Sequence, residues 1–187
     1  MTAPFDVTGV RLETERLILR PWLESDLPAF FAYTSDEAVE QGMGWERIES
    51  VEEAQEKFPV YRGDNESFAL VLKETGRVIG DLSVQVRPWE IYPLNQNLRG
   101  RELGFGIRSG YWGRGLVPEA VQAVLNYCFD VLDFDFVTCG HFFGNEKSHR
   151  VIKKCGFTHL FDAPWTFSDG KIIDISTYIM YNPHKER

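Results

Sequence analysis

The chain has 187 residues, a length that fits a single domain spanning residues 1–187. Hydrophobic residues make up 43% of it and aromatic residues 14%, which is enough for a sizeable core. It carries 20 Lys and Arg against 28 Asp and Glu, a net charge of −8. This acidic balance excludes nucleic acid as the expected partner, because binding it requires a basic stripe.

The cysteines and the hydropathy pattern place the protein in a broad class. Cys128, Cys139 and Cys155 form no CxxC pair and do not interleave with the four histidines at zinc-ligand spacings. We therefore expect reduced core thiols and no metal site. No apolar run approaches the ~20 residues of a membrane span. The N-terminus also lacks the basic-then-apolar arrangement of a signal peptide. A soluble cytoplasmic protein without a membrane partner is expected.

The N-terminal third predicts a strand followed by two helices. Residues 16–22 alternate like a strand, and residues 25–35 read as a helix with Ser25 or Asp26 as its N-cap. Residues 50–58 predict the second helix.

The second helix has a capping box at its start and a proline at its expected end. Ser50 is followed three residues later by Glu53, and Pro59 is expected to end the helix. Residues 68–86 then predict a hairpin that turns at Gly76. Residues 87–101 show no periodicity and predict a long loop.

The C-terminal half alternates strands and helices. Residues 102–107 predict a strand, and apolar residues spaced by three and four from Leu116 onward predict an amphipathic helix. A strand (136–142), a helix capped by Asn145 (145–157), a strand that starts at Phe157 and a last strand (171–181) follow. The order is that of a mixed α/β fold in which only residues 102–142 demand a parallel crossover.

The glycine-rich turn between the 102–107 strand and its helix does not match two common phosphate motifs. Gly110, Gly113 and Gly115 are too closely spaced for a P-loop, and no suitable lysine follows them. A dinucleotide fingerprint starting at Gly104 and Gly106 lacks its third glycine, and these two glycines lie inside the strand. A mononucleotide or NAD site is therefore disfavoured.

The same turn still favours an anion. Gly113 and Gly115 flank Arg114, so successive N–H groups can point one way at the start of a helix. The alternative is a tight turn in which the glycines only relieve steric clashes. Gly104 and Gly106 favour a bulge that opens a wedge beside the strand, where an extended amide-bearing ligand could pair. An extended amide arm that ends in a pyrophosphate describes coenzyme A.

Three segments resemble one protein family. "YWGRGLVPEA", "ETERLILRPW" and "NEKSHRVIKKCGF" resemble the GNAT superfamily, the Gcn5-related N-acetyltransferases, and within it the ribosomal-protein N-terminal acetyltransferases. In the signature Gln/Arg-x-x-Gly-x-Gly/Ala, Gly113 and Gly115 fill the last two fixed positions. The resemblance implies one N-acetyltransferase domain. It also implies a mixed, mostly antiparallel sheet with a central bulged parallel pair and flanking helices.

The resemblance also implies acetyl-CoA as cosubstrate. Its pantetheine arm would pair with backbone around Ile107 and Arg108, and Asn145 would approach that arm. Two positions depart from the family pattern: Gly110 replaces the signature Gln/Arg, and Pro118 replaces a threonine. Amides of the turn and the helix start would hold the pyrophosphate: Gly113, Arg114, Gly115, Leu116 and Val117.

Two residues carry the expected chemistry, which needs one base and one acid. Glu102, at the start of its strand, matches the family glutamate that takes the proton of the amine. Ser148 matches the serine that protonates or orients the leaving thiolate. Each also has a structural alternative, as a solvated carboxylate and as a helix hydroxyl satisfied by backbone. His141 is an alternative base.

The resemblance leaves the acceptor open. We expect acetyl transfer to a primary amine, of a protein N-terminus or a small molecule, by direct attack in a ternary complex. Trp45, Trp89 and Tyr92 are expected to border the acceptor cleft. The alternatives are a non-catalytic acyl-CoA sensor on the same fold and, outside it, a nucleotide-binding module. The protein is expected to be a monomer or a homodimer.

Overall fold

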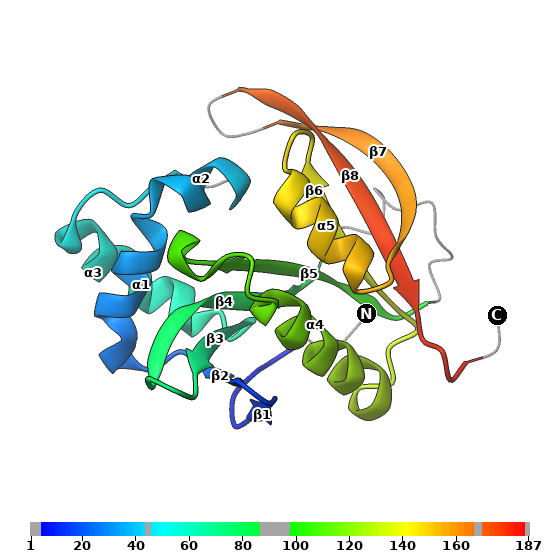
Figure 1. Cartoon of the computed structure of the whole chain (residues 1–187), viewed down its shortest axis with the longest axis horizontal. Coiled ribbons are helices and arrows are strands. Elements are labelled where there is room, and N and C mark those ends of the chain that lie inside the picture. Colours follow the sequence, from blue (N-terminus) through cyan, green and yellow to red (C-terminus); the bar gives the residue numbers. More distant parts are fainter. Residues whose placement is uncertain (1–4, 44–45, 87–97, 167–169, 186–187) are drawn as a thin grey trace.

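A single twisted sheet forms the centre of the molecule (Figure 1). The computed structural model describes residues 5–43, 46–86, 98–166 and 170–185. In these residues eight strands follow the order β1-β2-β3-β4-β5-β6-β8-β7. The strands are β1 (Leu12–Glu13), β2 (Leu17–Pro21), β3 (Ser67–Leu72), β4 (Arg77–Gln85), β5 (Gly100–Ile107), β6 (Phe136–Phe142), β7 (Thr158–Thr166) and β8 (Ile172–Tyr181). Every pairing between neighbours is antiparallel except β5 with β6, which confirms the predicted mixed sheet.

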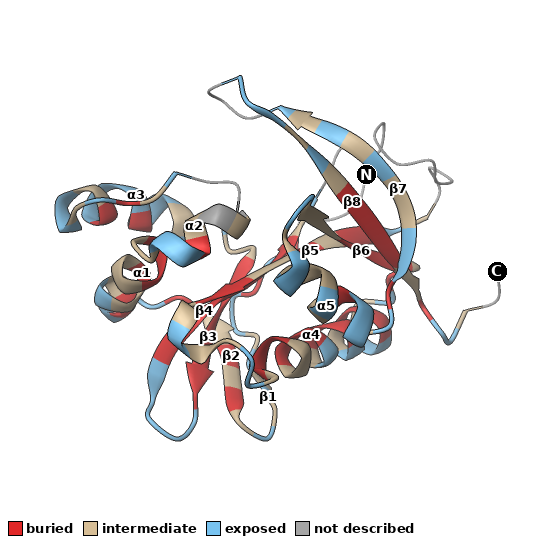
Figure 2. Cartoon of the chain, turned by 45° about the horizontal axis from the view of Figure 1, so that its top comes forward, coloured by how far each residue is buried: buried red, intermediate tan, exposed pale blue. Residues whose placement is uncertain are grey.

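Helices cover both faces of this sheet. On one face, α1 (Leu27–Thr34), α2 (Glu37–Met43) and α3 (Val51–Gly63) follow β2 in the chain. On the other face lie α4 (Leu116–Asn126), which continues as a π-helical turn, and α5 (Glu146–Lys154). Alternate residues of β3 divide between two apolar cores: Leu70 packs with α4, whereas Ala69 packs with α1 and α3. Figure 2 shows the resulting buried centre of the sheet.

The start of α3 forms as predicted, but its end does not. The Ser50 hydroxyl accepts from the Glu53 amide at 3.1 Å, and the Glu53 carboxylate accepts from the Glu49 amide at 2.9 Å. The expected end near Pro59 is wrong, because the helix continues through it to Gly63. Beyond the proline, Tyr61 packs its ring against Trp22 and Phe30, and this packing offsets the lost helix bond.

Helix α2 was not predicted, because its seven residues show no apolar periodicity. The Asp36 carboxylate holds its start by accepting from the amide of Ala38 at 3.2 Å. The same carboxylate accepts from the amide of Ser109 at 2.8 Å. It therefore ties α2 to the turn that follows β5.

The parallel pair separates partway along its length. β5 pairs with β6 only from Gly100–Phe136 to Leu103–Cys139. Beyond that point β5 stays paired with β4 as far as Ile107, while β6 stays paired with β8. The expected wedge between the two strands is therefore present. The pairings of β5 with β4 and β6 have a continuous register, so they do not contain the bulge expected at Gly104 and Gly106. Strand β5 begins at Gly100, two residues before the predicted start.

None of the helices in the described ranges is long and apolar enough to cross a membrane.

Candidate active site

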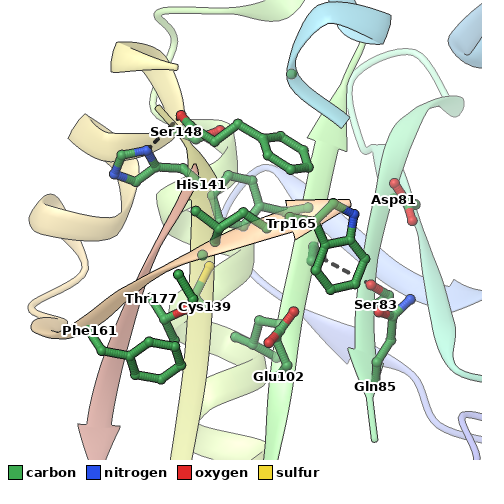
Figure 3. A pocket seen from close by; sticks show the side chains of 18 of the residues that line it. Asp81, Ser83, Gln85, Glu102, Cys139, His141, Ser148, Phe161, Trp165 and Thr177 are labelled. Carbon is green, nitrogen blue, oxygen red and sulfur yellow. Dashed lines mark hydrogen bonds between the residues drawn. The ribbon is translucent and has the colours of Figure 1, made fainter. Parts of the chain in front are cut away.

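A pocket of about 290 Å³ lies where β5 and β6 part (Figure 3). Its walls come from β4, β5, β6, β7 and β8, and from one residue each of α2, α3 and α5. The lining is a mixture of apolar, aromatic and polar side chains with two carboxylates, Asp81 and Glu102. The pocket therefore joins the two faces of the sheet at the mouth of the wedge.

The two predicted catalytic residues both line this pocket. Glu102 is the third residue of β5, and its neighbours across the sheet are Gln85 of β4 and Thr138 of β6. Ser148 comes from the first turn of α5. The Ser148 hydroxyl makes no hydrogen bond within the described part of the chain, although its amide does. The helix-satisfied alternative for this hydroxyl therefore does not hold.

His141, the alternative base, lies in a stack of aromatic rings. Its imidazole lies 5.0 Å from that of His149 and 5.6 Å from the ring of Tyr178. Its Nδ1 lies 3.0 Å from the carbonyl oxygen of Phe142, so Nδ1 carries the proton in the neutral ring. Its Nε2 is buried without a partner among the described residues. His141 also lines the pocket. It lies three positions after Thr138, the neighbour of Glu102, so its side chain points to the opposite face of the sheet.

Cys139 lies in the pocket wall, at the last position of β6 that pairs with β5. The side chain is buried, and this burial raises the pKa of the thiol well above its ordinary value. A neutral thiol is a poor nucleophile. The only sulfur in the described pocket wall is therefore unsuited to forming an acyl-enzyme.

The backbone of β5 beyond Leu103 offers donors to the wedge. The Arg108 amide donates to the carbonyl oxygen of Ile79 at 2.8 Å, so it is already used on the β4 side. Because N–H groups alternate along a strand, those of Phe105 and Ile107 point away from β4, into the wedge. The Trp112 indole N–H donates to the Ile107 carbonyl oxygen at 2.9 Å and so fixes the end of this strand. Of the two predicted pantetheine partners, only Ile107 has a backbone amide without a hydrogen-bond acceptor among the described residues.

The glycine turn after β5 forms a cradle of unused amides. Gly113 and Gly115 have φ of 75° and 76°, in the left-handed region, and Gly115 is the N-cap of α4. The Arg114 guanidinium donates to the Gly110 carbonyl oxygen at 3.0 Å and lies over the ring of Tyr111. In the described part of the chain, none of the backbone amides of this turn and helix start donates a hydrogen bond. These are the amides of Gly113, Arg114, Gly115, Leu116 and Val117.

An ion pair anchors this cradle to Arg16, the residue before β2. The Arg16 guanidinium lies 2.6 Å from the Glu119 carboxylate in the first turn of α4. The Glu119 carboxylate also accepts from the Arg16 amide at 2.8 Å. Arg16 further donates to the Arg114 carbonyl oxygen at 2.8 Å. These bonds hold the backbone of the turn in place through Arg16, about a hundred positions earlier in the chain.

Asn145 performs the predicted cap and an unexpected bridge. Its side-chain oxygen accepts from the Ser148 amide at 3.1 Å, which confirms the N-cap of α5. Its side-chain nitrogen donates to the carbonyl oxygen of Gly42 in α2 at 3.4 Å. Asn145 thus connects α5 to α2 across the mouth of the wedge.

Several pocket residues were missed by the sequence analysis. Asp81 and Trp165 line the pocket from β4 and β7. The available signal for Asp81 was a single acid inside the apolar run "VIGDLSV". The expected cleft residues Trp45, Trp89 and Tyr92 lie outside the described residues.

A cradle of backbone amides beside a wedge lined with strand amides fits an extended amide-bearing ligand that ends in phosphates. Residues 16–158 match the sequence profile described as "Acetyltransferase (GNAT) domain". The chain therefore belongs to the GNAT acetyltransferase family and is an acetyltransferase. Enzymes of this family use acetyl-CoA.

Individual relatives agree with this assignment. The chain is 27% identical over 180 residues to the uncharacterized N-acetyltransferase YoaA of Bacillus subtilis, covering 93% of this chain and 98% of the relative. Its fold matches the crystal structure of a GNAT-family acetyltransferase from Bacillus anthracis with a TM-score of 0.80 and 21% identity, covering 92% and 99% of the two chains. It also matches spermidine N-acetyltransferase from Vibrio cholerae, solved with CoA and spermine, with a TM-score of 0.70 and 19% identity, covering 90% and 97%.

Proposed function

We propose that the protein transfers the acetyl group of acetyl-CoA to a primary amine, by direct attack in a ternary complex. The observation that carries this proposal is that Glu102 and Ser148 line one pocket at the point where the parallel strands part. The amine would enter from the face that carries Glu102. The thioester would reach the pocket along the wedge.

Glu102 would take the proton of the amine. An α-amine has a pKa of about 8 and an alkyl or lysine amine of about 10.4, so either is mostly protonated at neutral pH. A carboxylate at the pocket wall removes that proton, directly or through a water molecule, as the nitrogen forms its bond to the acetyl carbon. The β5 amides that face the wedge would stabilise the negative charge that develops on the carbonyl oxygen.

Ser148 would act at the leaving sulfur. When the tetrahedral intermediate collapses, the carbon–sulfur bond breaks and the thiolate of CoA leaves. The free Ser148 hydroxyl can donate a hydrogen bond to this sulfur, and its position is fixed by the capped first turn of α5. The neutral Cys139 thiol favours direct transfer over a covalent acyl-enzyme.

The cradle of five unused amides would hold the pyrophosphate of CoA. Gly113 and Gly115 allow this backbone shape because their φ angles are positive. Ile107 would pair with the pantetheine arm. Asn145 would border that arm from α5, and Arg108 would contribute only through its side chain, because its amide bonds to β4.

The experiment is release of free thiol from acetyl-CoA in the presence of peptides, polyamines, amino acids or aminoglycosides. We expect at least one class to be acetylated, and Glu102→Gln to lower kcat by about 10²–10⁴-fold. Glu74→Gln, in the exposed hairpin turn, is the matched control and should leave kcat unchanged. Turnover that survives Glu102→Gln would exclude this base. Binding of CoA in calorimetry without acetylation of any amine would favour the acyl-CoA sensor instead.

A further inference from the structure

The wall of the pocket formed by β4 contains a buried carboxylate. Asp81 is 3% exposed. The hydroxyl of Tyr33, from α1, donates to one oxygen at 2.7 Å, and the hydroxyl of Tyr61, from α3, donates to the other at 2.5 Å. Burial raises the pKa of Asp81 to about 6, although the two phenol bonds act in the opposite direction. Asp81 is therefore largely ionised at neutral pH.

This charge has no cationic partner within the described residues. Asp81 takes part in none of the ion pairs of that part of the chain. A buried carboxylate without a countercharge is costly even when it accepts hydrogen bonds. Each Asp81 oxygen also keeps a lone pair after its phenol bond. The site can therefore accept a positive group from outside the protein.

Asp81 and Glu102 are separated along the pocket. In the antiparallel register of β4 and β5, Asp81 pairs with Gly106, whereas Glu102 pairs with Gln85. The two positions are four residues apart, about 13 Å at 3.3 Å per residue. Both carboxylates lie on the same face of the sheet, because residues four apart on a strand share a face.

An aromatic surface completes this part of the pocket. Trp165 of β7 lines the pocket together with Asp81. In Figure 3 its indole lies between Glu102 and the strand that carries Asp81. Indole faces attract ammonium groups, particularly where water is excluded. Trp165 thus adds an aromatic ring to the pocket that holds both carboxylates.

We propose that Asp81 binds a second positively charged group of the acceptor, so that the acceptor is a diamine-like compound rather than a monoamine. One amino group reacts beside Glu102, and the other cationic group binds Asp81, about 13 Å away along the strand. This assignment rests on the proposed acetyl transfer, because it identifies the acceptor of that same pocket. An acceptor with a single charged nitrogen gains no binding affinity from Asp81, because that nitrogen reacts beside Glu102.

The test compares linear diamines with monoamines of the same chain length in the thiol-release assay. For the wild type we expect kcat/KM to be about 100-fold higher for the best diamine than for its matched monoamine. Asp81→Asn, which keeps the shape of the side chain, should abolish this preference. Glu74→Gln is the control, because it removes a carboxylate that lies in the exposed hairpin turn outside the pocket, and the preference should remain.

Two results overturn the inference while the proposed function stands. One is equal acetylation of matched monoamines and diamines by the wild-type enzyme, a measurement that requires no variant. The other is an Asp81→Asn variant that keeps the diamine preference. Calorimetry of diamine binding in the absence of acetyl-CoA separates the two proposals. Binding that is lost in Asp81→Asn supports the inference even if no amine is acetylated, and unchanged binding contradicts it.

Discussion

The side-chain oxygen of Asn145 accepts a hydrogen bond from the amide of Ser148, at 3.1 Å. This bond caps α5 and at the same time sets the position of the Ser148 hydroxyl in the pocket. The capping of α5 and the placement of the proposed catalytic hydroxyl therefore depend on one side chain. The link makes several properties of the site measurable by substitution.

Asn145→Ala should lower the free energy of unfolding by about 1 kcal/mol, because the cap of α5 is lost. Asn145→Asp should restore most of that stability, since aspartate is an equally good cap. Urea unfolding of the two variants measures the difference. Equal losses in both variants would show that the bond to Gly42, which aspartate cannot donate, matters more than the cap.

Ser148→Ala should lower kcat by about 10–100-fold with little change in the KM for acetyl-CoA, because the hydroxyl is proposed to act on the leaving thiolate. The fold should be unaffected, since the cap uses the backbone amide of this residue. Ser148→Thr keeps a hydroxyl and should recover part of the loss. Steady-state kinetics with the best acceptor decide the matter, and an unchanged kcat in Ser148→Ala contradicts the assignment.

Gly113→Ala should raise the KM for acetyl-CoA and destabilise the turn by about 1–2 kcal/mol, because φ at this position is 75°. A methyl group there would meet no neighbouring atom, so the effect comes from backbone conformation alone. Gly110→Ala is the matched control: its surroundings are equally open, and its φ is not positive. Equal behaviour of the two variants in kinetics and thermal unfolding would contradict the role of the cradle.

Asp81 should impose a measurable pH dependence on stability. Its pKa is raised from 3.8 to about 6 by burial, so between these values the folded state holds a proton that the unfolded state has released. The contribution of Asp81 to stability therefore falls as the pH rises from about 4 to about 6, and then stays low. Relative to Asp81→Asn, the wild type should lose about 3 kcal/mol over this range.

Urea unfolding of both proteins at several pH values gives this difference, in which the other titrating groups largely cancel. A difference that does not vary between pH 4 and 7 would show that Asp81 is not buried in solution as it is in the structure. A difference that grows in favour of the wild type with rising pH would mean that a cation pairs with Asp81 in the folded protein.

The local features of the chain followed from the sequence because each depends on neighbouring residues. The Ser50–Glu53 capping box, the Asn145 cap and the turn at Gly76 all form as predicted. The glycine turn was also readable, since Gly113 and Gly115 occupy the positive φ that few other residues tolerate. These signals, with the family resemblance, were sufficient for the fold and the expected cosubstrate.

Tertiary structure alone decided which side chains share the pocket. Asp81 looked like an isolated acid in an apolar strand until Tyr33 and Tyr61, from two different helices, were seen to bond its two oxygens. The course of α3 beyond Pro59 likewise depended on packing against Trp22. The physical reason is the same in both cases: burial and long-range contacts set the energy of these groups, and sequence spacing does not encode such contacts.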